Sequence, residues 1–256
     1  MSVYVIASGK GGTGKTMLTA NLGAALALQN KRVAVLDGDI GLRNLDMALG
    51  LENRIMFDFF DVLEGRCTLD AALLRHPSLH SLYLLPAPQN RQSSDMPDGA
   101  IAQICRQLKE SFDFVLIDAP AGIGRGFWLC RQAAEGVIAV TLPQSAALRD
   151  CDRLLRLARN ACPPTIEGTY GFCSRVFVVL NRTQKKIMRK GLQQSTKDAE
   201  VVIGTSFSAV IPEDIMASRA HDGIPAVVRY ASPAGREIRK LAQEIIRHEG
   251  AEVLPQ

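Results

Sequence analysis

The sequence has few of the features that would place a protein in a membrane, outside the cell or on nucleic acid. It contains no uncharged run of about 18 apolar residues, the length that a helix needs to cross a bilayer. Its first residues show neither the basic region nor the cleavage site of a signal peptide. The formal net charge is only +4, and like charges form no long block. We therefore expect a cytoplasmic protein, with nucleic acid an unfavoured partner.

The cysteines lack the spacing that a disulfide framework or a zinc site needs. No two of them form a CxxC pair, and no histidine stands at zinc-ligand spacing from them. We expect reduced thiols that are buried as small apolar groups. They are Cys67, Cys105, Cys130, Cys151, Cys162 and Cys173.

Short apolar runs alternate with helical patterns along the 256 residues, without a repeat or a linker. The runs are continuously apolar, which is typical of parallel strands buried on both faces. We expect a single domain, residues 1–256, with an α/β fold: a doubly wound, mainly parallel sheet with helices on both faces. Strands are expected at residues 3–7, 33–36, 82–85, 114–117, 137–141, 176–180 and 209–211. Helices are expected at residues 15–29, 68–75, 100–110, 146–160 and 233–249.

Residues 9–16 carry the strongest motif. They read Gly-Lys-Gly-Gly-Thr-Gly-Lys-Thr, which matches the pattern G-x-x-x-x-G-K-T between an apolar strand and a helical pattern. Glycines let the backbone N–H groups surround phosphates, and the helix N-terminus adds partial positive charge. Lys15 would bridge the β- and γ-phosphates, and the Thr16 hydroxyl would ligate Mg²⁺. The motif therefore predicts a P-loop NTPase.

Acidic residues follow two of the expected strands. Asp118 ends one strand, where it would hold Mg²⁺ through water. A second strand ends in Asp37 and Asp39, and Asp39 is the candidate to orient the attacking water and complete the outer magnesium shell. Asn181 follows a third strand, where an amide could read an adenine edge. All should meet at one edge of a parallel sheet.

Lys10 directly follows the first glycine, at a position where an ordinary phosphate loop has no requirement. A lysine so early on the loop is poorly placed for the γ-phosphate of its own subunit. It could reach the nucleotide of a second subunit that faces this one, or it could be a solvated surface lysine. The residues by themselves leave both interpretations open.

These motifs resemble those of the MinD/ParA family of deviant Walker A ATPases. Residues 9–16 match its phosphate loop, in which the early signature lysine acts across a dimer that holds nucleotide between its subunits. Residues 39–46 and 50–54 are similar to switch I of the MinD branch, and residues 118–123 are similar to switch II. The likeness covers nearly the whole chain, including residues 149–153 (a partner-binding helix) and 211–214 (a nucleotide-side loop).

The resemblance implies an ATP-dependent homodimer that binds ATP with Mg²⁺ and hydrolyses ATP to ADP and phosphate. It implies a part in septum placement through recruitment of a division inhibitor, with a second, ATPase-stimulating partner, of the MinC and MinE type or equivalent. Asp150 and Asp152 match an acidic patch for partners. Catalytic positions are Lys10, Lys15, Asp39 and Asn44; metal positions are Thr16, Asp39 and Asp118; nucleotide-binding positions are Gly11, Gly12, Thr13, Gly14, Lys15, Thr16, Met17, Asn181 and Pro212.

The sequence departs from the family pattern in three places. Gly124 stands where an acid usually follows the switch II isoleucine, and Met17 replaces the usual second threonine, so stimulated hydrolysis could be altered. Residues 250–256 lack the basic amphipathic character of the family's membrane anchor, which leaves contact with the inner face of the cell membrane open. An apolar stripe precedes them, and we expect it to dock on the sheet; it comprises Ile238, Leu241, Ala242, Ile245 and Ile246.

Two other functions fit parts of the sequence. A ParA-like or flagellar-number-type positioning ATPase would act without touching lipid, and basic residues could then contact phosphate backbones, although a solvated face explains them as well. A metabolic P-loop kinase or ligase would need a second substrate motif, which is absent, and would give Lys10 no purpose. The basic residues are Arg182, Lys185, Lys186, Arg189 and Lys190.

Overall fold

The computed structural model describes residues 1–160, 175–218, 225–228 and 231–251. Cys162 and Cys173 and the end of the tail, residues 252–256, lie outside this part of the chain. The strands are β1 Ser2–Ala7, β2 Val33–Asp37, β3 Leu74–Arg75, β4 Leu82–Leu85, β5 Phe114–Asp118, β6 Gly136–Thr141, β7 Arg175–Thr183 and β8 Ala209–Pro212. The helices are α1 Lys15–Ala27, α2 Leu45–Leu49, η1 Glu52–Arg54, α3 Phe59–Leu63, α4 Leu69–Ala72, η2 Ser93–Asp95, α5 Ala100–Leu108, α6 Arg125–Gln132, α7 Ser145–Asn160, α8 Lys185–Arg189, α9 Thr196–Ile203, α10 Ile215–Ser218, η4 Ala226–Val228 and α11 Pro233–Ala251.

The eight described strands form one sheet in the order β3-β4-β2-β5-β1-β6-β7-β8. Every pairing is parallel except that of β3 with β4. The chain crosses from β1 to β2 on one side of the sheet and from β5 to β6 on the other, so the loops after β1, β2 and β5 lie side by side at the carboxyl ends of the central strands. Ligands of open α/β folds bind at this position.

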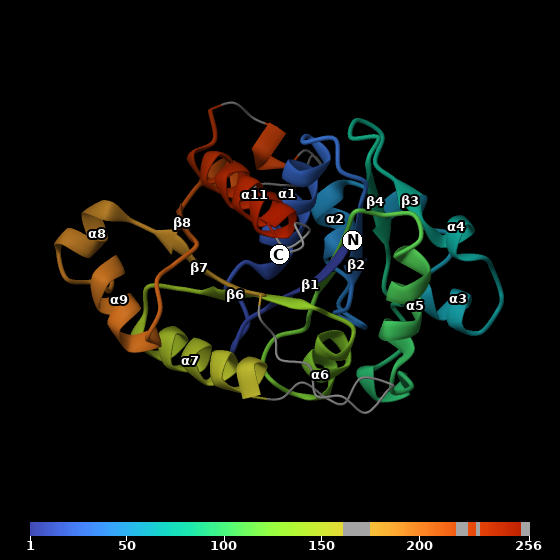
Figure 1. Cartoon of the computed structure of the whole chain (residues 1–256), viewed down its shortest axis with the longest axis horizontal. Helices are drawn as coiled ribbons and strands as arrows, with labels where there is room; N and C mark the ends of the chain where they lie inside the picture. Colours follow the sequence, from blue (N-terminus) through green and yellow to red (C-terminus); the bar gives the residue numbers. More distant parts are fainter. Residues whose placement is uncertain (161–174, 219–224, 229–230, 252–256) are drawn as a thin grey trace.

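Helices cover both faces of the sheet, as the continuous apolar strands predict (Figure 1). On one face, Val3, Val5 and Ala7 of β1 pack with residues of α3, α5, α6, α7 and α9. On the other face, Tyr4 and Ile6 pack with residues of α1, α2 and α11. The doubly wound, mainly parallel α/β sheet that the sequence predicts is confirmed.

The helix expected over residues 68–75 is wrong in its second half. Thr68 caps α4, which ends at Ala72, and Leu73 is already extended with ψ 121°. Leu74 and Arg75 form the antiparallel edge strand β3, paired with Leu84 and Tyr83. The short segment lacks the buried stripe that would hold a longer helix, whereas pairing with β4 satisfies its backbone. Helix propensity is overridden here by the neighbouring strand.

The terminal helix α11 docks on the sheet. Its apolar residues Ile238, Leu241, Ala242 and Ile245 are all fully buried in the core shared with α1. At its end, Glu249 accepts hydrogen bonds from the hydroxyls of Ser2 and Tyr4 and forms an ion pair with Arg175 at 3.0 Å. The apolar stripe therefore belongs to the protein core. In the part of the chain that the structure describes, no helix is both long enough and apolar enough to span a bilayer.

Candidate functional site

The phosphate loop connects β1 to α1 at the carboxyl edge of the parallel strands. Gly14 precedes α1 with φ 93°, and Gly12 has φ 74°. Both values lie in the left-handed region, which residues with a Cβ rarely adopt. A Cβ on Gly14 would lie only 2.4 Å from Nδ2 of Asn181. Glycine therefore lets the loop turn tightly into α1, whose first N–H groups stay available for phosphate.

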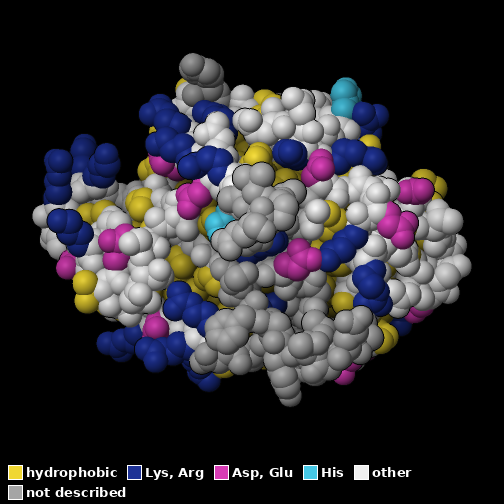
Figure 2. Space-filling model, in the orientation of Figure 1, with side chains coloured by type: hydrophobic (Ala, Val, Ile, Leu, Met, Phe, Trp, Pro, Cys, Tyr) yellow, Lys and Arg dark blue, Asp and Glu magenta, His cyan; other side chains and the backbone are white. Residues whose placement is uncertain are grey.

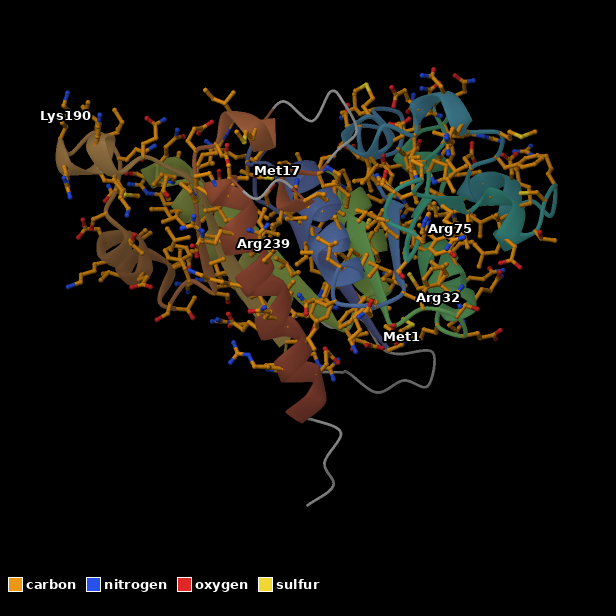
Figure 3. All side chains as sticks on the ribbon, turned by 90° about the horizontal axis from the view of Figure 1, so that it is seen from above. Met1, Met17, Arg32, Arg75, Lys190 and Arg239 are labelled. Atoms are coloured by element: carbon orange, nitrogen blue, oxygen red, sulfur yellow. The ribbon has the colours of Figure 1, made fainter. Side chains whose placement is uncertain are left out.

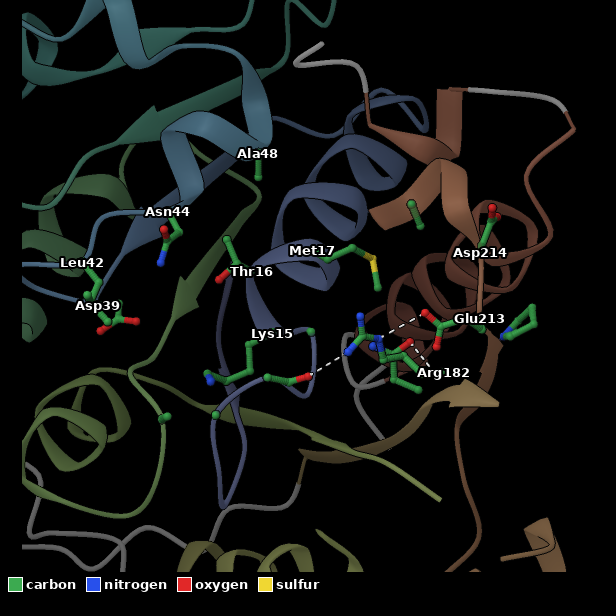
Figure 4. A pocket seen from close by; sticks show the side chains of 17 residues that line it. Lys15, Thr16, Met17, Asp39, Leu42, Asn44, Ala48, Arg182, Glu213 and Asp214 are labelled. Atoms are coloured by element: carbon green, nitrogen blue, oxygen red, sulfur yellow. Dashed lines mark hydrogen bonds and ion pairs between the residues drawn. The ribbon is translucent and has the colours of Figure 1, made fainter. Parts of the chain in front are cut away.

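A pocket of about 510 Å³ lies over this loop. Its volume falls within the usual range for a small-molecule site. Figure 4 shows Lys15, Thr16 and Asp39 toward one end and Met17, Arg182 and Asp214 toward the other. The structure brings together most of the predicted site residues as pocket lining: Gly11, Gly12, Gly14, Lys15, Thr16, Met17, Asp39, Asn44, Asn181 and Pro212.

Lys15 is nearly buried at the base of the site and donates a hydrogen bond to Oγ of Ser8 at 3.1 Å. The Ser8 hydroxyl in turn donates to the carbonyl oxygen of Lys10 at 2.7 Å. Burial lowers the pKa of Lys15, and the negative charges of Asp118 and Asp39 oppose that shift. A poorly hydrated ammonium in this position gains strongly from an added anion such as phosphate.

Asp118 ends β5 and is fully buried below the pocket, which it does not line. Burial raises its pKa to about 6, opposed by a hydrogen bond from the Thr16 side chain and by the charge of Lys15. The hydroxyl of Thr19 also donates to Asp118 at 3.3 Å. Asp118 thus reaches the pocket through Thr16, an arrangement that suits a carboxylate acting through an intermediate water.

The oxygen ligands beside the phosphate loop suit magnesium better than a metal ion whose ligands all come from the protein. Among the described residues, no group of three or more His, Cys, Asp or Glu side chains could hold an ion. The hydroxyl of Thr16 and the carboxylates of Asp39 and Asp118 gather instead beside the phosphate loop. Mg²⁺ commonly takes one or two protein oxygens and completes its octahedron with phosphate and water. These residues fit such an ion once a nucleotide is present.

Asp37 is a buried acid for which no role was predicted. Its carboxylate accepts the N–H of Asp39 at 3.0 Å and the N–H of Leu45 at 3.2 Å. Burial and the neighbouring Asp118 raise its pKa to about 8, although both hydrogen bonds oppose this shift. Asp37 therefore ties both ends of the loop of residues 39–45. Its position at the end of a strand was visible in the sequence, but these two contacts depend on the folded loop.

The loop after β2 supplies the side of the pocket near Lys15. Burial raises the pKa of Asp39, whereas the charge of Lys15 lowers it. Asn44 ends the loop at the start of α2 without a side-chain cap contact, and Figure 4 shows it beside the pocket. Leu42 is 71% exposed although it is apolar and lines the pocket. Leu42 therefore adds exposed apolar surface to the pocket lining.

Asn181 lies near the end of β7, where the pairing with β8 shifts register, and it contacts the phosphate loop directly. Its Nδ2 donates to the carbonyl oxygen of Thr13 at 2.8 Å, and its Oδ1 accepts the N–H of Arg182 at 2.9 Å. The amide is therefore already engaged in positioning the loop, although it also lines the pocket. Its reading of adenine stays a prediction.

Several pocket residues were missed by sequence reasoning. Arg182 adjoins the predicted Asn181, so its position in the chain was a usable signal, and Glu213 and Asp214 belong to residues 211–214, the predicted nucleotide-side loop. Asp214 also accepts hydrogen bonds from Ser232 at 2.6 Å and from the N–H of Ala234 at 3.1 Å, which fixes the start of α11. Leu42 and Ala121 fall within the predicted switch segments, residues 39–46 and 118–123. Ala48 and Ala217 gave no sequence signal, because only folding brings them to the site.

Lys10 points away from its own pocket. It does not line the pocket, and its Nζ donates to Oε1 of Gln144, before α7, at 3.4 Å. A Cβ on Gly9 would lie 2.5 Å from the Cβ of Asp150, so the start of the loop packs directly on α7. Thr13 is likewise buried outside the pocket lining. Lys10 is thus the one predicted catalytic residue that the isolated subunit leaves outside its site.

The surface of α7 is less acidic than the resemblance to the MinD/ParA family implies for Asp150 and Asp152. Asp152 is held by Arg156 in an ion pair of 3.0 Å, and Asp150 is only partly exposed. Arg149 and Arg153 occupy exposed positions of the same helix. The exposed side of α7 therefore carries cations beside its two acids.

The basic residues after Asn181 fall into two places. Arg182 lies over the phosphate loop, where its Nη1 donates to the carbonyl oxygen of Gly12 at 3.4 Å. The others belong to α8 and its end, and Figure 2 shows Lys and Arg side chains gathered over α8. Figure 3 places Lys190 at one end of the molecule, far from Arg75. The cations of α8 are thus an exposed cluster at the end of the molecule, comprising Lys185, Lys186, Arg189 and Lys190.

Known proteins share both the sequence and this architecture. The family model described as the CobQ/CobB/MinD/ParA nucleotide binding domain matches residues 4–224. The septum site-determining protein MinD of Thermotoga maritima is 39% identical over 252 residues, which cover 97% of this chain and 89% of that protein.

Two solved structures extend this agreement to the fold. The MinC:MinD cell division complex of Aquifex aeolicus contains a chain with a TM-score of 0.84 and 34% identity, covering 100% of this chain and 98% of that one. MinD of Pyrococcus horikoshii, solved with Mg-ADP, has a TM-score of 0.83 and 28% identity, with 99% of each chain covered. This chain therefore belongs to the MinD branch of the CobQ/CobB/MinD/ParA family of nucleotide-binding proteins.

Proposed function

We propose that the protein is a magnesium-dependent ATPase that switches between monomer and dimer and takes part in placing the division septum. Family membership, the phosphate loop and the pocket beside Lys15 support ATP hydrolysis. The likeness to septum site-determining proteins supports the cellular role. In this role the dimer recruits a division inhibitor, a proposal supported by the complex that the Aquifex relative forms with MinC.

Hydrolysis would depend on placement of the phosphates and of one water. The N–H groups of the loop and the Lys15 ammonium would hold the phosphates, and Thr16 and Asp118 would hold magnesium. Bound magnesium neutralises charge that develops on the transferred phosphoryl group. Asp39 and Asn44 orient the attacking water, and positioning contributes more here than proton abstraction. Gly122, whose N–H binds the carbonyl oxygen of Ser8 at 3.0 Å, couples switch II to the loop.

The position of Lys10 carries the proposal of dimerisation. Its side chain lies outside its own pocket on a long-range contact of 3.4 Å with Gln144, a weak hydrogen bond that is easily exchanged. Leu42 offers exposed apolar surface at the mouth of the same pocket. A second copy facing this one would cover Leu42 and receive Lys10 at its nucleotide. The metabolic-enzyme reading gives neither residue a purpose.

The test is the mass of the protein in solution with Mg-ATP. Asp39→Ala, chosen to slow hydrolysis, should run as a dimer with Mg-ATP and as a monomer with Mg-ADP. Asp39→Ala combined with Lys10→Ala should bind Mg-ATP but remain monomeric. If Asp39→Ala binds Mg-ATP and still runs only as a monomer, the dimer switch is wrong.

A further inference from the structure

Met17 lies between the two ends of the pocket, the end of Lys15 and Thr16 and the end of Arg182 and Asp214. It is the third residue of α1 and lines the pocket, half-buried against the core of α1 and α11. Helical side chains point back toward the N-terminus, so Met17 extends over the preceding turn. Its Cε lies 3.7 Å from the place that a Cβ on Gly14 would occupy. Figure 4 shows the thioether directed away from Lys15 and toward the side of Asp214.

Arg182 occupies the other side of this end of the pocket. Its Nη1 reaches the carbonyl oxygen of Gly12 at 3.4 Å, and its Nε forms an ion pair with Glu213 at 3.4 Å. The two contacts hold the planar guanidinium at the rim, while the side chain stays 47% exposed. Its backbone φ of 57° is left-handed, a strained value for arginine that the surrounding contacts must stabilise.

The chemistry of this end suits a flat aromatic ring better than another phosphate. A thioether and a guanidinium are both polarisable groups that bind the face or edge of a π system. Pro212 and Ala217 add apolar surface, whereas the ammonium and hydroxyl for phosphate, Lys15 and Thr16, lie at the opposite end. The thioether side chain of Met17 offers no hydrogen-bond donor for a phosphate.

We propose that the side chain of Met17 contacts the nucleobase and ribose of a bound purine nucleotide, with Arg182 facing it. This inference rests on the proposed function, because it takes the polyphosphate to lie on Lys15. The side chain of Met17 then contributes to binding of the nucleoside part, whereas its backbone N–H, which stays available for phosphate, is unchanged in Met17→Ala. The affinity for ADP relative to tripolyphosphate measures that contribution directly.

The test compares three proteins: the wild type, Met17→Ala and Met17→Leu. Calorimetry with Mg-ADP, and displacement of a fluorescent nucleotide by tripolyphosphate with magnesium, give the two affinities. Met17→Ala should bind Mg-ADP about two- to tenfold more weakly, the range of a lost sulfur–aromatic contact. Its affinity for tripolyphosphate should stay within about twofold of the wild type. Met17→Leu, which keeps the volume of the side chain, should lose less affinity for Mg-ADP than Met17→Ala does.

Two results would overturn the inference. Unchanged binding of Mg-ADP by Met17→Ala would show that Met17 does not touch the nucleoside. Equal weakening of Mg-ADP and tripolyphosphate would show that Met17 only supports the helix and the loop. Failure of the proposed function looks different, because the wild type itself would then bind neither ligand. Thermal unfolding of each variant confirms that the comparison is made on folded protein.

Discussion

Gly14 is the tightest backbone position of the site. It combines φ 93° with a 2.4 Å approach to the amide of Asn181, whereas Gly12 has φ 74° and open space around its Cα. The amide of Asn181 cannot retreat freely, because it is bound to Thr13 and Arg182. Alanine at position 12 would therefore meet only the cost of a left-handed backbone. Alanine at position 14 would meet that cost and would also collide with the side chain of Asn181.

We expect Gly12→Ala to lower the free energy of unfolding by about 1–2 kcal/mol, the cost of a left-handed conformation for alanine. Gly14→Ala should cost about 1–3 kcal/mol more, because the new methyl group also displaces Asn181. Gly14→Ala should bind Mg-ADP far more weakly than Gly12→Ala does. Urea unfolding and calorimetry measure both effects, and equal losses for the two variants would contradict the role of the collision.

Asp37 makes the stability of the nucleotide-free protein depend on pH. Its pKa is about 8 in the folded chain, above the value of about 3.9 that a free aspartate has. Between these values the folded state keeps a proton that the unfolded state has lost. The free energy of unfolding therefore falls as pH rises from about 4 to about 8. Asp118, with a folded pKa of about 6, contributes in the same direction at the lower end of this range.

Asp37→Asn should make this decrease smaller. Thermal unfolding in magnesium-free buffer at pH 5, 6, 7 and 8 compares the variant with the wild type, so that other titrating groups cancel. The variant should lose less stability than the wild type between pH 5 and pH 8. Parallel curves would show that Asp37 is charged in both states.

At the scale of single elements, α11 illustrates how one apolar stripe can have two interpretations. Its spacing in the sequence suits either a docked helix or a helix lying on a membrane. In the structure Leu241 and Ile245 are fully buried between α1 and β8, and Glu249 contacts Ser2 and Tyr4 at the start of the central strand β1. The stripe is therefore committed to the core.

We expect Leu241→Ala to lower the free energy of unfolding by about 2–5 kcal/mol, as for other buried leucines. Leu192→Ala is the matched control, because Leu192 is 73% exposed, and it should change stability by no more than about 0.5 kcal/mol. Urea unfolding of the two variants gives the comparison. A small effect of Leu241→Ala would mean that α11 leaves the sheet easily.

At the scale of the whole molecule, the pocket joins distant parts of the chain. Its lining includes Lys15 from the first helix, Asp39 after β2, Ala121 after β5, Arg182 of β7 and Glu213 after β8. A ligand that contacts all of these segments binds the folded state and not the unfolded chain. Nucleotide should therefore stabilise the entire fold.

Mg-ADP at a hundred times its dissociation constant should add about 2.7 kcal/mol to the free energy of unfolding. For a chain of this size that corresponds to a rise of about 5–11 °C in the unfolding midpoint. Chelation of magnesium should remove much of the rise, and Gly14→Ala should show little of it at the same concentration. A rise that persists in Gly14→Ala would place the ligand elsewhere.

The sequence by itself determined the sheet and the phosphate loop, because both rest on local patterns. Buried parallel strands must be continuously apolar, and a loop that wraps phosphate needs glycines before Lys15 and Thr16. Tertiary structure decided what depends on contacts between distant segments. It buried the stripe of α11, turned Leu74 and Arg75 into an edge strand, and engaged Asn181 with the loop. It also placed Met17 opposite Arg182, since the two are 165 residues apart in the chain and meet only when β7 reaches the loop.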